Sequence, residues 1–511
     1  MPKVLTAGRP WRVILVFAVP LLIGNVVQQL YQVTDAVIVG RTLGVDALAA
    51  VGATGSLLFL LIGFAWGMTS GFAIPTAQAF GAGDHAAVRR SIAAGTMLTA
   101  IASVVLTVLA LGLTRPALTL LRTPPELMGQ ATTFATVSFA GAVATMFYNY
   151  LAAAIRAIGD SRTPLVFLTI CCGLNAALVV VLVRFAGLGV GGAALATVAS
   201  QAISVGLCLA YIRRRVPVLL VRREDWRAAT AELGTHLRIG LPMGFQASII
   251  AIGTLAVQFR LNELGADAVA AYTTATRVDG LAVALLASVG LAVSTFVAQN
   301  HGARRPDRIR VGVRQGTVIA VVGSVLLGAV LVTSAAPIIR LFVGPDQEQV
   351  VHMGAHLLAI NGSLYTMLGV LFVLRGALQG LGHAFVPTMT GVVELVMRVG
   401  ASLVLGSIFG YVGVLWGNPL AWLGAVVLLV PAYLRAQRAL GTEPAIGAPS
   451  PVADVEPVLV EGPAEGSMVV EAVVPQPRAS ADGGAPAEAA PAEAAPDPAS
   501  IDRRTPEPAA R

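Results

Sequence analysis

Long apolar runs constrain the fold of this chain more than any other feature of its sequence. A helix needs about 20 mainly apolar residues to cross the hydrocarbon core of a bilayer. Twelve runs of that kind occur before residue 440. They cover approximately 13–39, 47–74, 91–113, 128–154, 164–184, 190–211, 239–260, 268–298, 316–336, 350–374, 387–408 and 412–434. We therefore predict an all-α polytopic membrane protein with 12 transmembrane helices.

The overall composition agrees with this class. Hydrophobic residues make up 56% of the chain and charged residues only 12%, whereas about a quarter of the residues in a soluble domain are charged. The basic residues lie in short loops between apolar runs, so they do not indicate a nucleic-acid partner. The sequence shows no metal-ligand cluster, no nucleophile–base pair and no phosphate-binding loop. We expect neither an enzyme nor a metal or other cofactor.

The distribution of arginines predicts how the helices are oriented. With an even number of spans, both termini lie on one side, and the loops on that side, such as 213–227 and 304–314, hold most of the arginines. Positive residues are enriched in cytoplasmic loops. We therefore expect a multi-pass protein of the cytoplasmic membrane with both termini in the cytoplasm.

The sequence also contains two related halves. LGVDALAA at 43–50 recurs as LGADAVAA at 264–271, and the segment that begins at Gln78 aligns at the same offset with the segment that begins at Gln299. Two six-helix lobes in the same orientation are thus predicted, an arrangement typical of transporters whose substrate path lies between the repeats. The expected organisation is an N-terminal lobe at 1–212, a basic inter-lobe loop at 213–238, a C-terminal lobe at 239–442 and a tail at 443–511.

The tail differs in composition from the rest of the chain. Residues 443–511 have a net charge of −8, are rich in Pro, Ala and Glu, and contain no aromatic residue. Such a segment cannot bury an apolar core. It is predicted to be a disordered acidic cytoplasmic tail.

The first span has a polar face. At 100° per residue, Asn25, Gln28, Tyr31, Gln32 and Asp35 fall on one side of the helix, and we expect them to face a polar cavity. Burial disfavours the charged form of a carboxylate, so Asp35 could exchange a proton. The alternative is that neighbouring hydroxyls and amides satisfy Asp35 permanently. Pro20 interrupts the helical hydrogen bonds fifteen residues earlier and is expected to act as a hinge.

Other polar residues inside the spans are candidates for the same region. Asn175 and Thr197 could offer oxygen atoms to a cation or to Asp35, or could serve only as contacts between helices. In the second half, one pair of polar residues is a candidate for lining the cavity. A second pair, spaced i, i+4, is interpreted as a structural ion pair. These are Arg277 and Asp279 for the cavity, and Glu394 and Arg398 for the ion pair.

Several stretches resemble those of the multidrug and toxic compound extrusion (MATE) transporters, within the MOP flippase superfamily. They are VPLLIGNVVQQLYQVTDAVIVGRTLG, PTAQAFGAGD, IRAIGDSRTP, GVGGAALATVASQ, TRVDGL and STFVAQNHGA. The likeness is greatest to the branch named for DNA-damage-inducible protein F, because the first span has an aspartate while the seventh and tenth spans have no acidic residue. Pro20 matches the proline at which the first helix of this family is thought to bend.

The resemblance implies a site for the coupling ion. In that branch the first-span aspartate binds the ion together with a tyrosine, an asparagine and a threonine, which match Asp35, Tyr31, Asn175 and Thr197. The family's second aspartate would fall at position 179, which is Val179 here. One carboxylate is therefore missing, and coupling to H⁺ is favoured over coupling to Na⁺.

These observations lead to one functional hypothesis and two alternatives. The hypothesis is a monomeric antiporter in the lipid bilayer that exports an organic, amphipathic or cationic small-molecule substrate by alternating access. The first alternative is a flippase for a lipid-linked precursor or an exporter of a metabolite, although a flippase is expected to have more spans and a cavity rich in arginine. The second is a membrane scaffold whose tail recruits partners.

Overall fold

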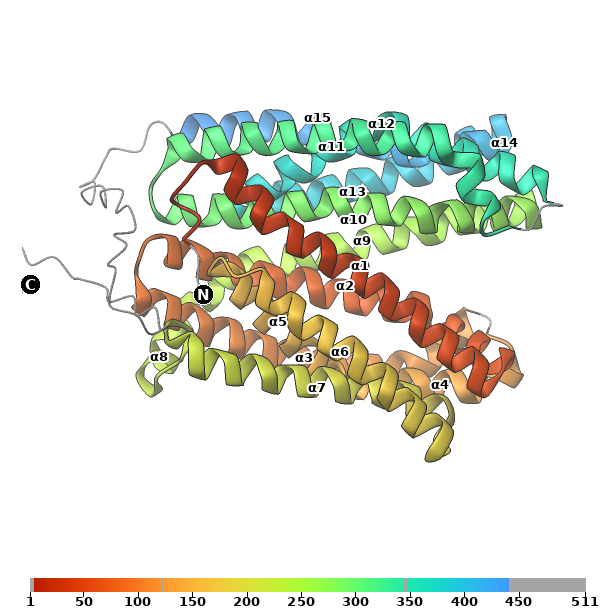
Figure 1. Ribbon diagram of the computed structural model, residues 1–511, viewed down its shortest axis with the longest axis horizontal. Coiled ribbons are helices and arrows are strands. Elements are labelled where there is room, and N and C mark those ends of the chain that lie inside the picture. Colours follow the sequence, from red (N-terminus) through yellow and green to blue (C-terminus); the bar gives the residue numbers. More distant parts are fainter. Residues whose placement is uncertain (1–3, 122, 344–346, 441–511) are drawn as a thin grey trace, which may run out of the picture. The chain divides into compact units, whose positions relative to one another are not determined.

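All regular secondary structure in the described part of the chain is helical. The computed structural model describes residues 4–121, 123–343 and 347–440, and Figure 1 shows how the helices are arranged. The α-helices are α1 (Pro10–Leu43), α2 (Val45–Gly81), α3 (His85–Leu120), α4 (Pro125–Ala140), α5 (Ala142–Ala157), α6 (Arg162–Val179), α7 (Gly189–Arg215), α8 (Arg223–Ala228), α9 (Leu233–Leu264), α10 (Ala266–Gly302), α11 (Pro306–Arg340), α12 (Glu348–Gly380), α13 (Phe385–Gly400), α14 (Gly406–Leu415) and α15 (Gly417–Ala439). Two π-helical segments, η1 (Val180–Phe185) and η4 (Ala401–Leu405), and two short 3₁₀ helices, η2 (Pro217–Leu219) and η3 (Ala229–Glu232), complete the set.

The predicted fold class is confirmed, and each predicted span falls on a helix or a broken helix. Within the described residues, 10 helices are long and apolar enough to cross a membrane, and α4 with α5, bent by 46°, makes up to 11. The remaining predicted span, 239–260, lies within the 32-residue α9. The count of 12 membrane-crossing helices therefore stays a prediction.

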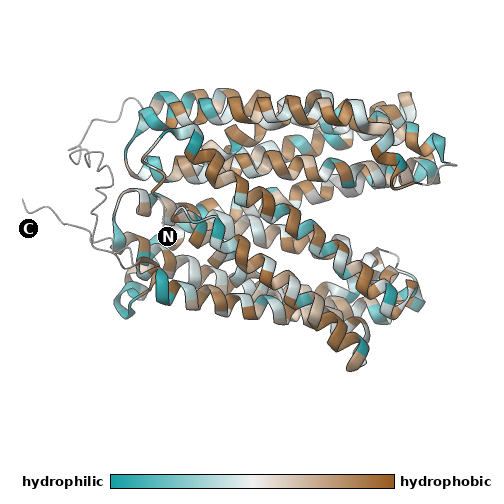
Figure 2. Cartoon of the chain, in the orientation of Figure 1, coloured by the Kyte–Doolittle hydropathy of each residue, from teal (hydrophilic) through white to brown (hydrophobic). Residues whose placement is uncertain are grey.

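The helices expose apolar side chains along their middle parts. Figure 2 shows hydrophobic residues along the helix bodies and hydrophilic residues gathered towards both ends. On α3, Val104 and Val108 are 58% and 63% exposed, and on α11, Leu326 is 63% exposed. Water would disfavour this much exposed apolar surface, whereas lipid chains cover it without cost.

Backbone conformation repeats between the two halves at the offset seen in the sequence. Gly44 before α2 and Gly265 before α10 have φ of +89° and +103°. Gly83, after α2, has φ +73°, and its equivalent after α10 is Arg304, whose φ is +53°. A side chain in this left-handed region is unusual, so the turn geometry persists even where the glycine does not. The sequence repeat is thus also a structural repeat.

Helix α1 packs against both halves. Near its start, Ile14 is fully buried in an apolar cluster with Leu286 of α10, and near its end, Val39 is buried with Val179 of α6. Pro20 is buried between these two parts, and the helix continues through it. Because a proline removes one helical hydrogen bond, the weakest point of α1 lies where the helix passes from one core to the other.

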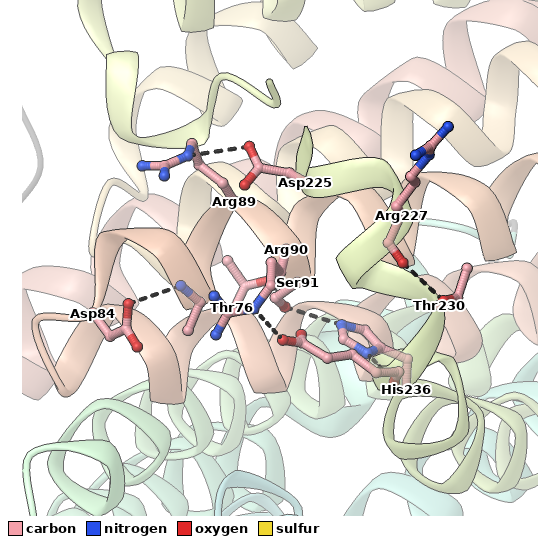
Figure 3. Close-up of polar contacts among 11 residues, drawn as sticks. Thr76, Asp84, Arg89, Arg90, Ser91, Asp225, Arg227, Thr230 and His236 are labelled. Carbon is pink, nitrogen blue, oxygen red and sulfur yellow. Dashed lines mark hydrogen bonds and ion pairs between the residues drawn. The ribbon is translucent and has the colours of Figure 1, made fainter. Parts of the chain in front are cut away.

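The segment between the halves is held against the start of α3 by two ion pairs. Arg89 Nε lies 3.2 Å from Asp225 Oδ2, a pair shown in Figure 3, and Arg90 Nε lies 3.0 Å from Glu232 Oε1. The predicted basic loop is therefore largely helical, with α8 and its neighbours, and it binds α3 through its few acidic residues.

A buried hydrogen-bond network continues from this attachment into the protein. His236 at the start of α9 is fully buried, and its Nε2 lies 2.9 Å from Ser91 Oγ on α3. Ser91 Oγ lies 2.8 Å from Thr76 Oγ1 on α2, as Figure 3 shows. The other ring nitrogen, Nδ1, lies 2.9 Å from the Glu232 carbonyl oxygen. His236 thus joins three helices.

The described residues belong to one compact unit. The predicted disordered tail at 443–511 lies outside the described residues, and the predicted boundaries of the lobes stay predictions.

The buried His236 gives the protein a specific pH dependence of stability. Burial lowers the pKa of its imidazole, because desolvation disfavours the charged ring. The stability from the neutral ring is present above the unfolded pKa of about 6.5 and is lost as the pH falls from there through the folded pKa. The midpoint of thermal unfolding in detergent should therefore fall between about pH 7.5 and about pH 5.5 by more in the wild type than in His236→Gln. Equal falls in the two proteins would contradict this role.

Candidate functional site

Three of the residues predicted for the coupling site lie together in the first half. Tyr31 Oη on α1 donates to Thr197 Oγ1 on α7 at 3.1 Å, and Asn175 Nδ2 on α6 donates to the same oxygen at 3.1 Å. The Thr197 hydroxyl in turn donates to the Ala193 carbonyl oxygen at 3.3 Å. A hydroxyl has one proton and two lone pairs. All three are in use, so Thr197 has no free lone pair for a cation in this arrangement.

Asp35 lies one helical turn beyond Tyr31 and is half-buried. Its Oδ1 atom is buried without a hydrogen-bond partner. Within the described part of the chain, no hydrogen bond joins Asp35 to Tyr31, Asn175 or Thr197. A charged carboxylate oxygen without a donor is costly in a low-dielectric site, whereas the protonated form is much less so. Asp35 therefore lacks the hydrogen bonds expected of a carboxyl group whose only role is to hold helices together.

Position 179 offers no second carboxylate. Val179 is fully buried in an apolar cluster with Val183 and Val190. Across the described residues, no group of three or more His, Cys, Asp and Glu side chains could hold a metal ion. If a cation binds in the first half, its protein ligands are therefore Asp35 and the neutral oxygen atoms of its neighbours.

The remainder of the polar face on α1 has two parts. Asn25 Nδ2 donates to Ser288 Oγ at 2.9 Å and to the Ala284 carbonyl oxygen at 3.3 Å, both on α10. Gln28 and Gln32 are exposed. The polar face of α1 thus contacts the second half at Asn25 and is exposed at Gln28 and Gln32.

Asp279 occupies a satisfied site in the second half. It is only 6% exposed, and its Oδ1 accepts hydrogen bonds from Asn361 Nδ2 at 2.9 Å and from Tyr365 Oη at 2.6 Å. Arg277, two residues earlier, is exposed. Sequence reasoning did not identify Asn361 and Tyr365, although two polar residues four apart in an apolar span are a signal that one helix face is polar.

The ion pair of Glu394 differs from the prediction. Among the described residues, Glu394 pairs with Arg375 of α12 and not with Arg398. The Arg398 side chain instead runs past Gly253 of α9 and Gly417 of α15, which takes its guanidinium away from Glu394. Arg375 was missed because it falls one residue beyond the predicted tenth span.

A small cavity lies between the halves. Its volume is about 40 Å³, and its lining is mainly small or apolar side chains of α2, α5, α9, α10 and α12, with Arg156 and Gln379 as the larger polar groups. A buried water molecule needs about 10–15 Å³ of such space, so the cavity is large enough for a few water molecules.

Comparison with known proteins connects this architecture to one family. The MatE family model matches residues 20–181 and 242–423. The chain is 30% identical to the probable multidrug resistance protein YoeA of Bacillus subtilis (strain 168), over 83% of this chain and 93% of that protein. It is 27% identical to the probable multidrug resistance protein YpnP of the same strain, over 74% of this chain and 84% of YpnP.

A solved structure shares the fold. It is an outward-facing conformation of a multidrug resistance MATE family transporter of the MOP superfamily, with a TM-score of 0.78 and 22% sequence identity. The likeness covers 86% of this chain and 98% of that one. The fold of this chain is therefore that of the solved transporter over nearly the whole length of the latter.

The hydrogen bonds to Asp279 should contribute measurably to stability. In Tyr365→Phe the buried carboxylate loses one of its two donors, so the free energy of unfolding should fall by about 1 kcal/mol or more. Tyr411→Phe is the matched control, because the Tyr411 hydroxyl is buried without a partner and its removal should cost nothing. Thermal unfolding in detergent measures both. Equal stability of the two variants would show that the Tyr365 bond is unimportant.

Proposed function

The chain belongs to the MatE family, a family of membrane transporters rather than enzymes, and we propose that it is a multidrug exporter that works as a proton-coupled antiporter. In this proposal the protein is a monomer of the cytoplasmic membrane with both termini in the cytoplasm. Protons enter down their gradient while an organic, amphipathic or cationic solute leaves. The names of YoeA and YpnP support the breadth of substrates.

The unpartnered oxygen of Asp35 is the observation on which the proton coupling rests. Asp35 Oδ1 is buried without a donor, so the environment favours the protonated carboxyl group in this conformation. In this conformation the neutral form of the carboxyl group is favoured, and the charged form becomes favoured when water or a hydrogen-bond donor reaches it. Such a group can take up and release one proton per cycle. The buried Asp279, by contrast, accepts two hydrogen bonds at its Oδ1 atom.

The surroundings of Asp35 are less suited to sodium. A hard cation prefers several oxygen ligands. The Thr197 hydroxyl already makes three hydrogen bonds, and the apolar Val179 stands where a second carboxylate would supply both a ligand and a charge. Sodium binding would require the breaking of at least one of those hydrogen bonds.

Helix α1 connects the proton site to the relative position of the halves. Its first part is buried in the core of the second half and its last part, near Asp35, in the core of the first half. A change in charge at Asp35 alters how the last part packs, and the missing hydrogen bond at Pro20 lets the helix bend between the two cores. We infer that proton binding and the opening of the halves are coupled through this helix.

The flippase alternative gains little from the structure. A pyrophosphate headgroup requires unneutralised arginines in the cavity. Arg375 adds a buried arginine, but its charge is paired with Glu394, and Arg277 is exposed. Arg156 lines the cavity and has no carboxylate partner among the described residues, but a single such charge falls short of the arginine-rich cavity expected of a flippase.

Asp35→Asn tests the coupling. In proteoliposomes with an imposed proton gradient, export of a cationic dye by this variant should fall to the level of empty vesicles, because an amide cannot exchange a proton. Asp46→Asn is the control, since Asp46 is an exposed carboxylate on the neighbouring α2 and its loss should leave export unchanged. A sodium gradient alone should drive no export by the wild type.

Two outcomes would overturn the assignment. Proton-driven export that persists in Asp35→Asn would remove Asp35 from the mechanism. If export by the wild type requires a sodium gradient and is unaffected by the proton gradient, the coupling ion is Na⁺ and not H⁺.

A further inference from the structure

Two glutamines related by the internal repeat bind the opposite halves of the protein. Gln78 of α2 donates from Nε2 to the Gly380 carbonyl oxygen of α12 at 2.9 Å. Gln299 of α10 donates from Nε2 to the Ala157 carbonyl oxygen of α5 at 2.7 Å. Gln78 and Gln299 are equivalent in the repeat, and so are Ala157 and Gly380. The two contacts are therefore the same interaction, made once in each direction.

The backbones of α2 and α10 touch at the same place. A Cβ atom added to Gly81 would overlap with the carbonyl oxygen of Gln299, and one added to Gly302 would overlap with the carbonyl oxygen of Gln78. Gly81 and Gly302 are again repeat equivalents. Only glycine permits so close an approach, and the approach brings each glutamine within reach of its acceptor on the other half.

This crossing separates the inter-half cavity from one end of the molecule. Ala77 and Ala298, each next to a glutamine of the pair, line the cavity. Beyond the crossing, α2 and α10 end at Gly81 and Gly302, on the side where α1 begins. Gln299 is fully buried, so water does not compete for its hydrogen bonds. A route to the cavity that runs between α2 and α10 from this end is therefore closed at the crossing.

We propose that Gln78 and Gln299, here called the glutamine pair, form a reciprocal gate that holds the N-terminal end of the transporter closed and separates when the protein opens to that end. The proposal rests on the transport function proposed above and adds two positioning residues to it. Each glutamine amide donates a hydrogen bond to the carbonyl oxygen of the last residue of a helix in the other half. In the open state, water would donate to that carbonyl oxygen instead. Opening the gate exchanges these bonds for bonds to water, a change that costs little net energy and can be reversed in each cycle.

The gate is not fully symmetric. Gln299 Oε1 accepts a hydrogen bond from the Leu5 backbone N–H at 2.8 Å, and Asn300 Nδ2 donates to the Leu5 carbonyl oxygen at 3.3 Å. The N-terminal segment thus covers the second half's side of the crossing. Loss of the Gln299 side chain should open the gate more than loss of the Gln78 side chain, because it also releases this segment.

The first experiment uses isosteric variants and a distance measurement. Spin labels on His85→Cys and His383→Cys, both exposed positions in different halves, report the opening after the three native cysteines are replaced by alanine. In the double variant Gln78→Glu, Gln299→Glu, the ionised carboxylates face carbonyl oxygens and cannot donate. A population longer by roughly 5 Å or more should appear at high pH and should shrink at low pH, where a protonated carboxyl group donates again.

Two controls separate the gate from a general loss of structure. The parent labelled protein measures any pH-dependent opening that comes from Asp35, and the double variant should show the longer population in excess of the parent at high pH but not at low pH. Gln201→Glu changes a glutamine whose side chain bonds to Thr145 within the first half, and it should leave the distance unchanged. If the double variant keeps the parent distance at every pH, or if Gln201→Glu opens the protein equally, the proposal is overturned.

The glycine crossing provides an independent test. Gly81→Ala and Gly302→Ala should each prevent closure and shift the labels to the longer distance, while Gly112→Ala, which has nothing within 4 Å of an added Cβ, should not. Unchanged closed distances in both crossing variants would exclude a tight gate at this site. The distances need no transport, so a gate that opens as expected stands even if Asp35→Asn shows that the coupling assignment is wrong.

Discussion

Hydrocarbon offers no hydrogen bonds, and the polar groups of this protein are arranged around that constraint. The backbone is helical throughout the described spans because helices satisfy their own amides. The same requirement explains the buried Arg375–Glu394 pair and the two donors that reach Asp279. Among the described residues, Asp35 Oδ1 is the one carboxylate oxygen that is buried without a hydrogen-bond partner. The buried carboxylates of Asp279 and Glu394 both have partners, and this contrast is the basis of the proposed proton coupling.

The two halves share a backbone and differ in their buried chemistry. The turn before α2 recurs before α10, and a π-helical segment interrupts the equivalent helix in each half. In the first half, however, the polar cluster around Thr197 is neutral and the carboxyl group beside it is unpartnered, whereas in the second half both carboxylates have partners. The first half therefore holds a buried carboxyl oxygen without a partner, whereas the two buried carboxylates of the second half are bonded to side chains of a neighbouring helix.

The sequence alone predicts the parts of this structure that depend on periodicity. Apolar runs locate the helices, because spans must be long and continuous, and repeated motifs reveal the duplication. Tyr31, Asn175 and Thr197 could be grouped through the family resemblance, and the structure brings those three together. Whether they form the coupling site stays a prediction.

Contacts between helices were harder to predict, since they depend on packing that no local pattern encodes. Glu394 has an arginine four residues later on its own helix, yet it pairs with Arg375 across a helix boundary. Asn25 lies on the expected polar face, but its amide is bound to α10. The donors to Asp279 come from a helix more than eighty residues away in the chain.

The mutual contacts of Gln78 and Gln299 have the geometry of an isologous interface, in which one surface meets a copy of itself across a two-fold axis. In a true dimer of six-helix subunits, any substitution at such a contact would change both sides at once. Joined in one chain, the two sides can diverge, and the bond between Leu5 and Gln299 is a divergence of this kind. Because both halves are encoded in one chain, the two sides of the proposed gate can be selected separately, which is impossible in a symmetric dimer.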